Sequence, residues 1–167
     1  MISVRLIAAS ILIQTILSSG CSAPQNSSNG INSRVNSNAN TATVAANDKD
    51  EELEAMIRMP FPSDETLWRE ETGADQKRKL TAVLRYSSGD TQKLEDQASK
   101  SGVPQAVEIE AESWFPPELV AKSQQSGNET IKGKSYPATD FFQTPFTQGR
   151  ISRIDGTNYF VLELYGN

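Results

Sequence analysis

The sequence predicts an α+β domain over residues 48–167, built from a small mixed sheet of about four strands with short helices packed on one side. Two stretches, 79–86 and 105–115, alternate apolar and polar residues in the way that strands do. A helical pattern separates them, and the pair Asp155–Gly156 stands between two apolar runs, which is typical of a β-hairpin. A domain that contains both strands and helices follows from these three signals.

The domain is expected to begin with a short helix within residues 47–59. Acidic residues crowd its first turn, where they suit the helix dipole. Its apolar residues have the i, i+3, i+4 spacing of one helix face: Leu53, Met56 and Ile57. Pro60 ends this helix, because proline cannot continue a helical hydrogen-bond pattern. The next stretch, 63–76, is compatible with a helical turn or with an irregular strand.

A strand, a helix and a second strand form the clearest unit. The helix, 87–101, starts where Ser87 and Asp90 approximate a capping box, and it stops at Gly102. The flanking strands are 79–86 and 105–115. Because tight loops join the three elements, we expect a right-handed crossover that leaves the two strands parallel and adjacent.

The last third of the domain is expected to hold another short helix, a loop and the hairpin. The helix spans 116–127, since proline is favourable in a first helical turn. Residues 125–135 are predicted to form a mobile loop. In the hairpin, alternation places Ile151 on the same face as Phe160, Leu162 and Leu164, so that face is predicted to belong to the core.

The first residues have the layout of an exported precursor. Arg5 precedes an apolar, uncharged run at 6–17, and small residues follow it, which is the order found in secretory signal peptides. This run of 12 residues is shorter than the ~20 that a spanning helix needs. A removable signal peptide is therefore predicted for residues 1–20.

The end of this signal peptide resembles the lipobox of bacterial lipoproteins, carried by Leu17, Ser18, Ser19, Gly20 and Cys21. The resemblance implies cleavage after Gly20 and attachment of fatty acyl chains such as palmitate to Cys21. Two or more such chains hold a protein firmly at a membrane. The resemblance also implies a destination. Aspartate directly after the cysteine would favour retention in the inner membrane, so Ser22 at that place implies the outer membrane, facing the periplasm, if the cell has two membranes.

Residues 21–47 are predicted to be the lipidated cysteine followed by a disordered tether. The tether is rich in Asn and Ser, lacks aromatic residues and has Arg34 as its only charge. Such a composition cannot bury enough apolar surface to fold. The abrupt change near Asn47 marks the start of the folded domain, 48–167.

Charge and composition exclude several function classes. The domain carries all 21 acidic residues of the chain but 14 basic ones, a net charge of −7, which argues against a nucleic-acid partner. The chain has no histidine, and its one cysteine is Cys21. Serine–histidine and cysteine–histidine nucleophiles and the usual zinc sites are thereby ruled out. We predict no cofactor and no metal centre.

Three glutamates are one candidate site. Glu108, Glu110 and Glu112 alternate along the strand at 105–115 and so project from one face. They are candidates for a cation site or for a carboxylate pair that hydrolyses glycan. The alternative interpretation is a solvated face whose repulsion is relieved by Lys79 and Arg85 of the preceding strand.

A set of aromatic residues is the other candidate site, as a contact surface for a ligand or partner. Aromatic side chains among prolines and turn residues can bind peptide or sugar. The alternative is that they fill the core of a small domain. The residues are Trp114, Phe115, Tyr136, Phe141 and Phe142.

These observations predict a membrane-anchored lipoprotein of the bacterial cell envelope whose domain binds a protein or glycan partner without catalysis. Two alternatives stay open. One is a carboxylate-dependent hydrolase acting on cell-wall glycan, and the other is a structural or assembly factor of the envelope.

Overall fold

The computed structural model describes residues 45–167. The predicted signal peptide, Cys21 and most of the predicted tether fall within residues 1–44 and lie outside the described residues.

Six strands form one sheet in which every pair of neighbours is antiparallel. The order across the sheet is β1-β2-β6-β5-β4-β3. The strands are β1 (Glu65–Thr72), β2 (Arg78–Arg85), β3 (Gln105–Glu110), β4 (Thr130–Pro137), β5 (Phe146–Ile154) and β6 (Tyr159–Gly166). β1 and β3 are therefore the two edges.

Three α-helices and one 3-10 turn complete the domain: α1 (Asp50–Glu54), α2 (Ser88–Ser101), α3 (Pro117–Ser126) and η1 (Thr139–Phe141). Ser87 caps α2 by accepting a hydrogen bond from the Asp90 backbone N–H (3.1 Å). Within residues 45–167, no helix combines the length and the apolar character that crossing a bilayer requires.

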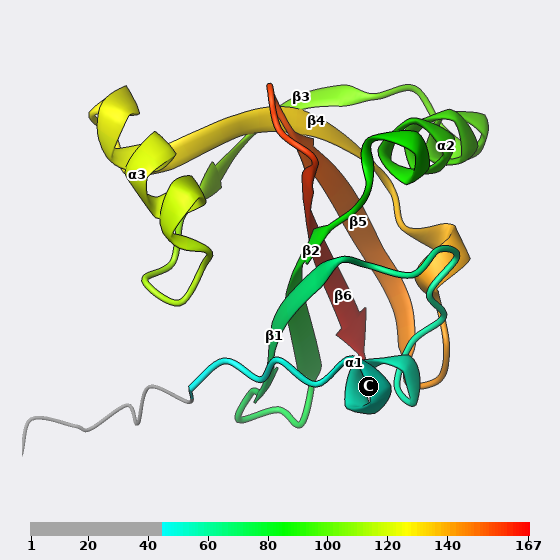
Figure 1. The fold of residues 1–167 in the computed structure, drawn as a ribbon. Helices are drawn as coiled ribbons and strands as arrows, with labels where there is room; N and C mark the ends of the chain where they lie inside the picture. Colours follow the sequence, from blue (N-terminus) through cyan, green and yellow to red (C-terminus); the bar gives the residue numbers. More distant parts are fainter. Residues whose placement is uncertain (1–44) are drawn as a thin grey trace, which may run out of the picture. The chain divides into compact units, whose positions relative to one another are not determined.

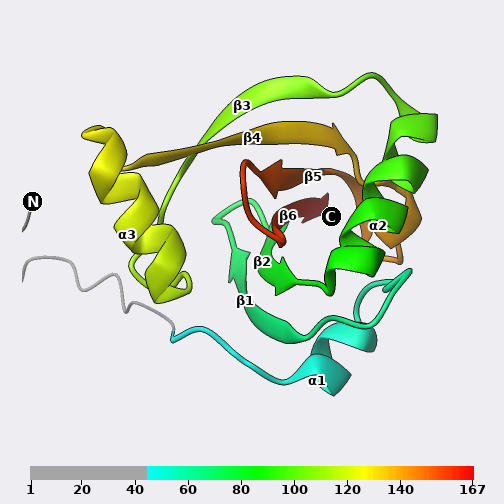
Figure 2. The same cartoon turned by 45° about the horizontal axis from the view of Figure 1, so that its top comes forward.

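The sheet is strongly bent, with α1 and α2 on one side and α3 on the other (Figures 1 and 2). In Figure 2 the outer strands curve toward α3. The bend brings the two edges of the sheet close together. Arg69 of β1 therefore reaches Glu112, just after β3, and pairs with it at 3.1 Å. The α3 side is thus the concave face.

The larger core lies on the convex face, beneath α1 and α2. Helix residues Leu53 and Leu94 pack there against strand residues that follow the two-residue period. These strand residues are Trp68, Leu80, Ala82, Leu84, Tyr136, Phe146, Ile151, Phe160, Leu162 and Leu164. Burying so many large side chains removes on the order of 1,000 Å² or more of apolar surface from water, at about 25 cal/mol per Å².

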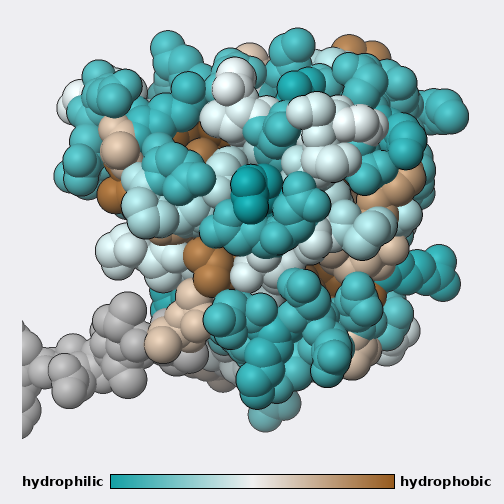
Figure 3. All heavy atoms as spheres, viewed as in Figure 1, coloured by the Kyte–Doolittle hydropathy of each residue, from teal (hydrophilic) through white to brown (hydrophobic). Residues whose placement is uncertain are grey.

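A second, smaller core fills part of the concave face. Leu119 of α3 and Phe115 pack there against Val83, Val161, Ile154, Tyr159, Ile109 and Ile131. β2 and β6 consequently bury residues on both faces. On the face of the molecule drawn in Figure 3, hydrophilic residues dominate the surface and hydrophobic ones form small separate spots.

The segment before α1 lies along the outer edge of β1. The backbones of Asn47 and Trp68 exchange two hydrogen bonds of 2.8 Å, and the Trp68 indole N–H donates to the Lys49 carbonyl (3.2 Å). The Asn47 side chain accepts a hydrogen bond from the Lys49 N–H (3.0 Å), and α1 has no side-chain cap among the described residues.

The α+β class and the C-terminal hairpin are confirmed. β5 and β6 pair around residues 155–158, with Gly156 in the left-handed region (φ 70°). Ile151, Phe160, Leu162 and Leu164 lie together in the larger core, as alternation predicts.

The expected number of strands, about four, is too low. The ambiguous stretch after Pro60 contains strand β1, and the predicted mobile loop at 125–135 contains most of β4. The sequence of β4 lacks a clear strand pattern. Gly133 follows Ile131 on one face of the strand, where a second apolar residue would be expected, and charged residues occupy the other face. Only pairing with β3 and β5 makes this sequence a strand.

The expected mixed sheet, with a crossover between adjacent parallel strands, is wrong, and so is the placing of all helices on one side. β2 and β3 run in the same direction, but β6, β5 and β4 lie between them. The C-terminal hairpin supplies two of these strands, so α2 has to cross the convex face to reach the far edge. α3 instead covers the concave face, because the bent sheet buries apolar residues on that side too.

Candidate functional site

The concave face continues beyond α3 as two rows of polar side chains. Because strand residues alternate, Val83 and Val161, which pack beneath α3, share their face with residues two and four positions along each strand. These residues of β2 and β6 pair with each other and with residues of β1 and β5, which gives two rows across the sheet. The inner row, nearer α3, is Arg69, Thr81, Glu163 and Arg150, and the outer row is Glu71, Lys79, Tyr165 and Gln148. We call these eight residues the polar trough.

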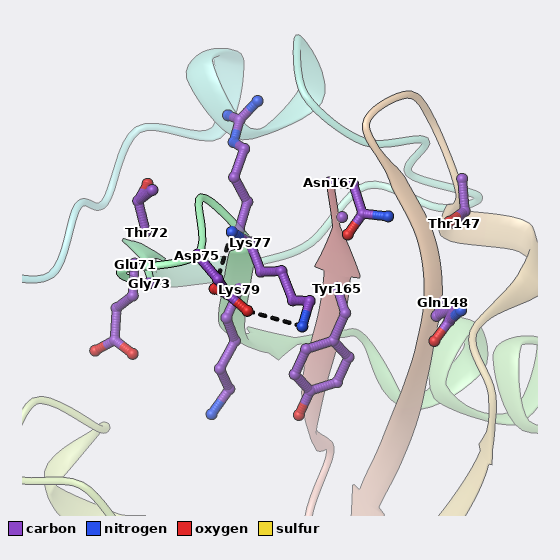
Figure 4. Close-up of a pocket in the computed structure, with 12 residues that line it drawn as sticks. Glu71, Thr72, Gly73, Asp75, Lys77, Lys79, Thr147, Gln148, Tyr165 and Asn167 are labelled. Carbon is purple, nitrogen blue, oxygen red and sulfur yellow. Dashed lines mark hydrogen bonds and ion pairs between the residues drawn. The ribbon is translucent and has the colours of Figure 1, made fainter.

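The outer row borders a hollow of about 520 Å³ (Figure 4). Tyr165 lies between Lys79 and Gln148, and its side chain is among the few large ones of the described residues that remain exposed (43%). The turn before β2 forms another wall, where Lys77 and Asp75 pair at 2.7 Å. An exposed ring surrounded by amide, ammonium and carboxylate groups can contact a ligand that has both apolar and hydrogen-bonding surfaces.

The inner row borders a second hollow of about 460 Å³, enclosed by the bend of the sheet. Thr81, Val161 and Glu163 line it from the middle strands, and Phe115 lines it near α3. Lys79 lines both hollows, so the two are neighbours along the trough.

Glu163 is the one acidic side chain of the described residues that is buried (8% exposed). Burying a charge is costly unless it is paired, and Glu163 has two cations beside it. Arg150 Nε donates to its Oε2 (2.5 Å), and Lys79 Nζ lies 3.6 Å from its Oε1. Both cationic side chains stay partly exposed, at 37% for Lys79 and 46% for Arg150.

A second ion pair joins the edges of the sheet. Arg69 donates to Glu112 Oε2 (3.1 Å), which also accepts the Trp114 indole N–H (2.7 Å). The Arg69 guanidinium lies 5.8 Å from the centre of the Trp114 ring and 3.4 Å from Glu71. This cluster fixes the chain after β3 against β1 and so holds one wall of the inner hollow.

The three glutamates singled out from the sequence border the inner hollow but differ in setting. Glu108 and Glu110 are exposed on edge strand β3, and β3 ends before Glu112, which turns to Arg69. The cross-strand neighbour of Glu108 is Lys132, whereas Lys79 and Arg85 belong to β2, which does not pair with β3. Within residues 45–167, no three acidic residues gather closely enough to hold a metal ion.

The structure does not bring the five aromatic candidates together. Phe115 and the partly buried Trp114 belong to the concave core. On the opposite face, Tyr136 and Phe141 are buried in the convex core and Phe142 packs at its border. The five rings therefore form no common surface.

Sequence reasoning missed Tyr165, Glu163 and Arg150 and considered Lys79 only as a charge neutraliser. One signal for Glu163 was present: it is a lone carboxylate in the run "YFVLELYG", where every other residue of the strand except Tyr165 is buried. A charge in such a strand implies a partner on a neighbouring strand.

No protein-family model matches the chain, and no curated protein or solved structure is detectably similar to it. The chemistry of the polar trough is therefore the basis on which a function is inferred.

Proposed function

We propose that this protein is an exported lipoprotein of the bacterial cell envelope, anchored through Cys21 and carrying a non-catalytic domain that binds saccharide in the polar trough. The lipobox-like sequence before Cys21 supports the anchor, and its Ser22 supports the outer membrane in a cell with two membranes. In that compartment, cell-wall glycan is the abundant polymer that an anchored domain meets.

The observation that carries the saccharide assignment is the exposed ring of Tyr165 in the outer hollow. A sugar ring has an apolar face of C–H groups and a rim of hydroxyl groups. Tyr165 offers a flat surface for the first, and Gln148 and Lys79 beside it offer hydrogen-bonding groups for the second.

The ion pairs of the trough favour binding over hydrolysis. Glycan hydrolysis requires a carboxylic acid that can donate a proton to the leaving oxygen, commonly in an apolar pocket. Glu163, Glu112 and Glu71 instead serve as counter-ions, each within 4 Å of a cationic nitrogen.

Co-sedimentation with purified peptidoglycan sacculi tests the proposal, using the full-length chain in detergent micelles. We expect saturable binding that Tyr165→Ala weakens at least about tenfold, since loss of a central aromatic contact costs about 2 kcal/mol or more. Val103→Ala is the matched control, because Val103 is a large exposed side chain (85%) outside the trough.

Equal binding by Tyr165→Ala and the unsubstituted chain would contradict the saccharide site. Release of soluble muropeptides would favour the hydrolase alternative. Retention by a solubilised envelope protein, with no affinity for sacculi, would favour the assembly factor.

A further inference from the structure

We propose that the inner hollow binds a carboxylate group of the saccharide, held between Lys79 and Arg150. This inference rests on the proposed function and names the ligand more closely, as a sugar with an acidic substituent rather than a neutral one.

The groups around Glu163 carry an excess of positive charge. One buried carboxylate stands between two cations, so the three groups together carry a net charge of +1. Glu163 therefore fixes both cations at the floor of the hollow without neutralising them. A single carboxylate bound between them would be paired with this local excess of positive charge.

Arg150 and Lys79 both have hydrogen-bond donors that no side chain of the described residues uses. Within residues 45–167, Arg150 uses only its Nε in a side-chain hydrogen bond, which leaves both terminal nitrogens of the guanidinium available. Lys79 Nζ, at 3.6 Å from Glu163, is an ion-pair partner but makes no hydrogen bond there. Charge-assisted hydrogen bonds from such groups to a carboxylate are among the stronger polar interactions.

The two hollows lie next to each other along the polar trough, so one ligand can occupy both. Lys79 lines both, and its cross-strand neighbour is Tyr165. A sugar ring resting on Tyr165 therefore has Lys79 beside it, and a substituent directed along the trough reaches Arg150. The aromatic surface and the two cations can act on one ligand.

The other acidic groups restrict which anion fits. Glu112 is paired with Arg69, but Glu108 and Glu110 also border the hollow, and neither has an ion-pair partner among residues 45–167. Their negative charge disfavours a dianion such as phosphate. A monoanionic carboxylate is the group that the cation pair accommodates.

Nuclear magnetic resonance titration of the full-length chain in detergent micelles tests the inference with two probes. N-acetylmuramic acid and N-acetylglucosamine differ by one lactyl ether that carries a carboxylate. We expect the acid to bind at least about tenfold more tightly, as shown by the backbone shifts of Tyr165 and Gln148, and this preference to fall as salt screens the charges.

Arg150→Met should remove most of the preference while leaving the affinity for N-acetylglucosamine. Lys79→Met should also remove most of the preference, but it should weaken N-acetylglucosamine as well, because Lys79 lies beside Tyr165. Each variant leaves Glu163 one cationic partner, so the fold should survive, which thermal unfolding checks. Lys100→Met, on exposed α2, is the matched control and should keep the preference.

Equal affinities for the two sugars, with Tyr165→Ala still weakening both, would overturn the carboxylate subsite and leave the saccharide site standing. A preference that persists in both methionine variants would also overturn it. Binding of neither sugar would count against the subsite and the proposed function together.

Discussion

Glu95 shows how one residue of α2 ties the helix to two strands of the convex face. Its Oε1 accepts a hydrogen bond from the Tyr136 hydroxyl (2.9 Å), and its Oε2 pairs with Arg153. Burial, followed by the hydrogen bond to Glu95, raises the pKa of Tyr136 to about 12 from its ordinary 10.0. The phenol is thus kept neutral in the folded state well above the pH at which it ionises in the unfolded chain.

This shift predicts how stability depends on alkaline pH. Because the folded pKa is the higher one, the stabilising contribution is complete below pH 10 and is lost as the pH rises toward 12. Tyr136→Phe cannot ionise, so its free energy of unfolding should fall less steeply over that range than that of the unsubstituted protein. Urea unfolding at pH 8, 10, 11 and 12 measures both slopes, and identical slopes would contradict the assignment.

At the scale of single residues, burial in the core could be predicted from the sequence, but the partners of a buried charge could not. Ile151 and Phe160 could be placed in the core because a strand's period of two leaves little choice. Glu163 breaks the same pattern, and its meaning depends on Lys79 and Arg150, which lie far away in the sequence. The sequence indicates that such a charge needs a partner but not which partner it has.

At the scale of elements, β4 depends on a close approach to β5 at Gly133. A Cβ atom there would lie 2.3 Å from the carbonyl oxygen of Arg153, so the two strands could not keep their spacing. The glycine that weakens the strand pattern in the sequence is thus the residue that permits pairing in the sheet.

We therefore expect Gly133→Ala to lower the free energy of unfolding by about 1–3 kcal/mol, the usual cost of overpacking. Gly89→Ala is the control, because Gly89 lies in the first turn of α2 and its Cβ would meet nothing closer than Ser87 Oγ at 3.9 Å. That variant should be neutral or more stable by up to about 1 kcal/mol. Urea denaturation measures both, and equal effects would contradict the role of Gly133.

The strand order explains why predicted elements did not yield the predicted arrangement. Periodicity, capping residues and turn residues predicted β2, α2, β3, α3 and the hairpin, because each of these signals is local. Such local signals carry no information on which strands become neighbours. The hairpin at the end of the chain lies between β2 and β4, which both precede it in the sequence. The candidate site was missed for the same reason, since its rows join β1, β2, β6 and β5.

For the whole molecule, the proposed anchor has a direct test. Cys21→Ser removes the thiol that would carry the acyl chains, so the protein should leave the detergent phase and should keep its signal peptide or appear as a soluble form. Phase partitioning and intact-mass measurement of protein from native membranes check this. Unchanged partitioning, or an unacylated native protein, would contradict the anchor.

Among residues 45–167, the backbone pairing of Asn47 with Trp68 is the first contact that a force applied through the N-terminal segment would load. In a chain held through Cys21, tension enters the fold at this edge, where two backbone hydrogen bonds and the indole contact to Lys49 resist it. These bonds are few and lie at the rim of the sheet, so we expect them to open before the ladder between β1 and β2 does. In the proposed anchored protein, such an opening would absorb the first displacement and leave the strands that carry Tyr165 and Glu163 paired.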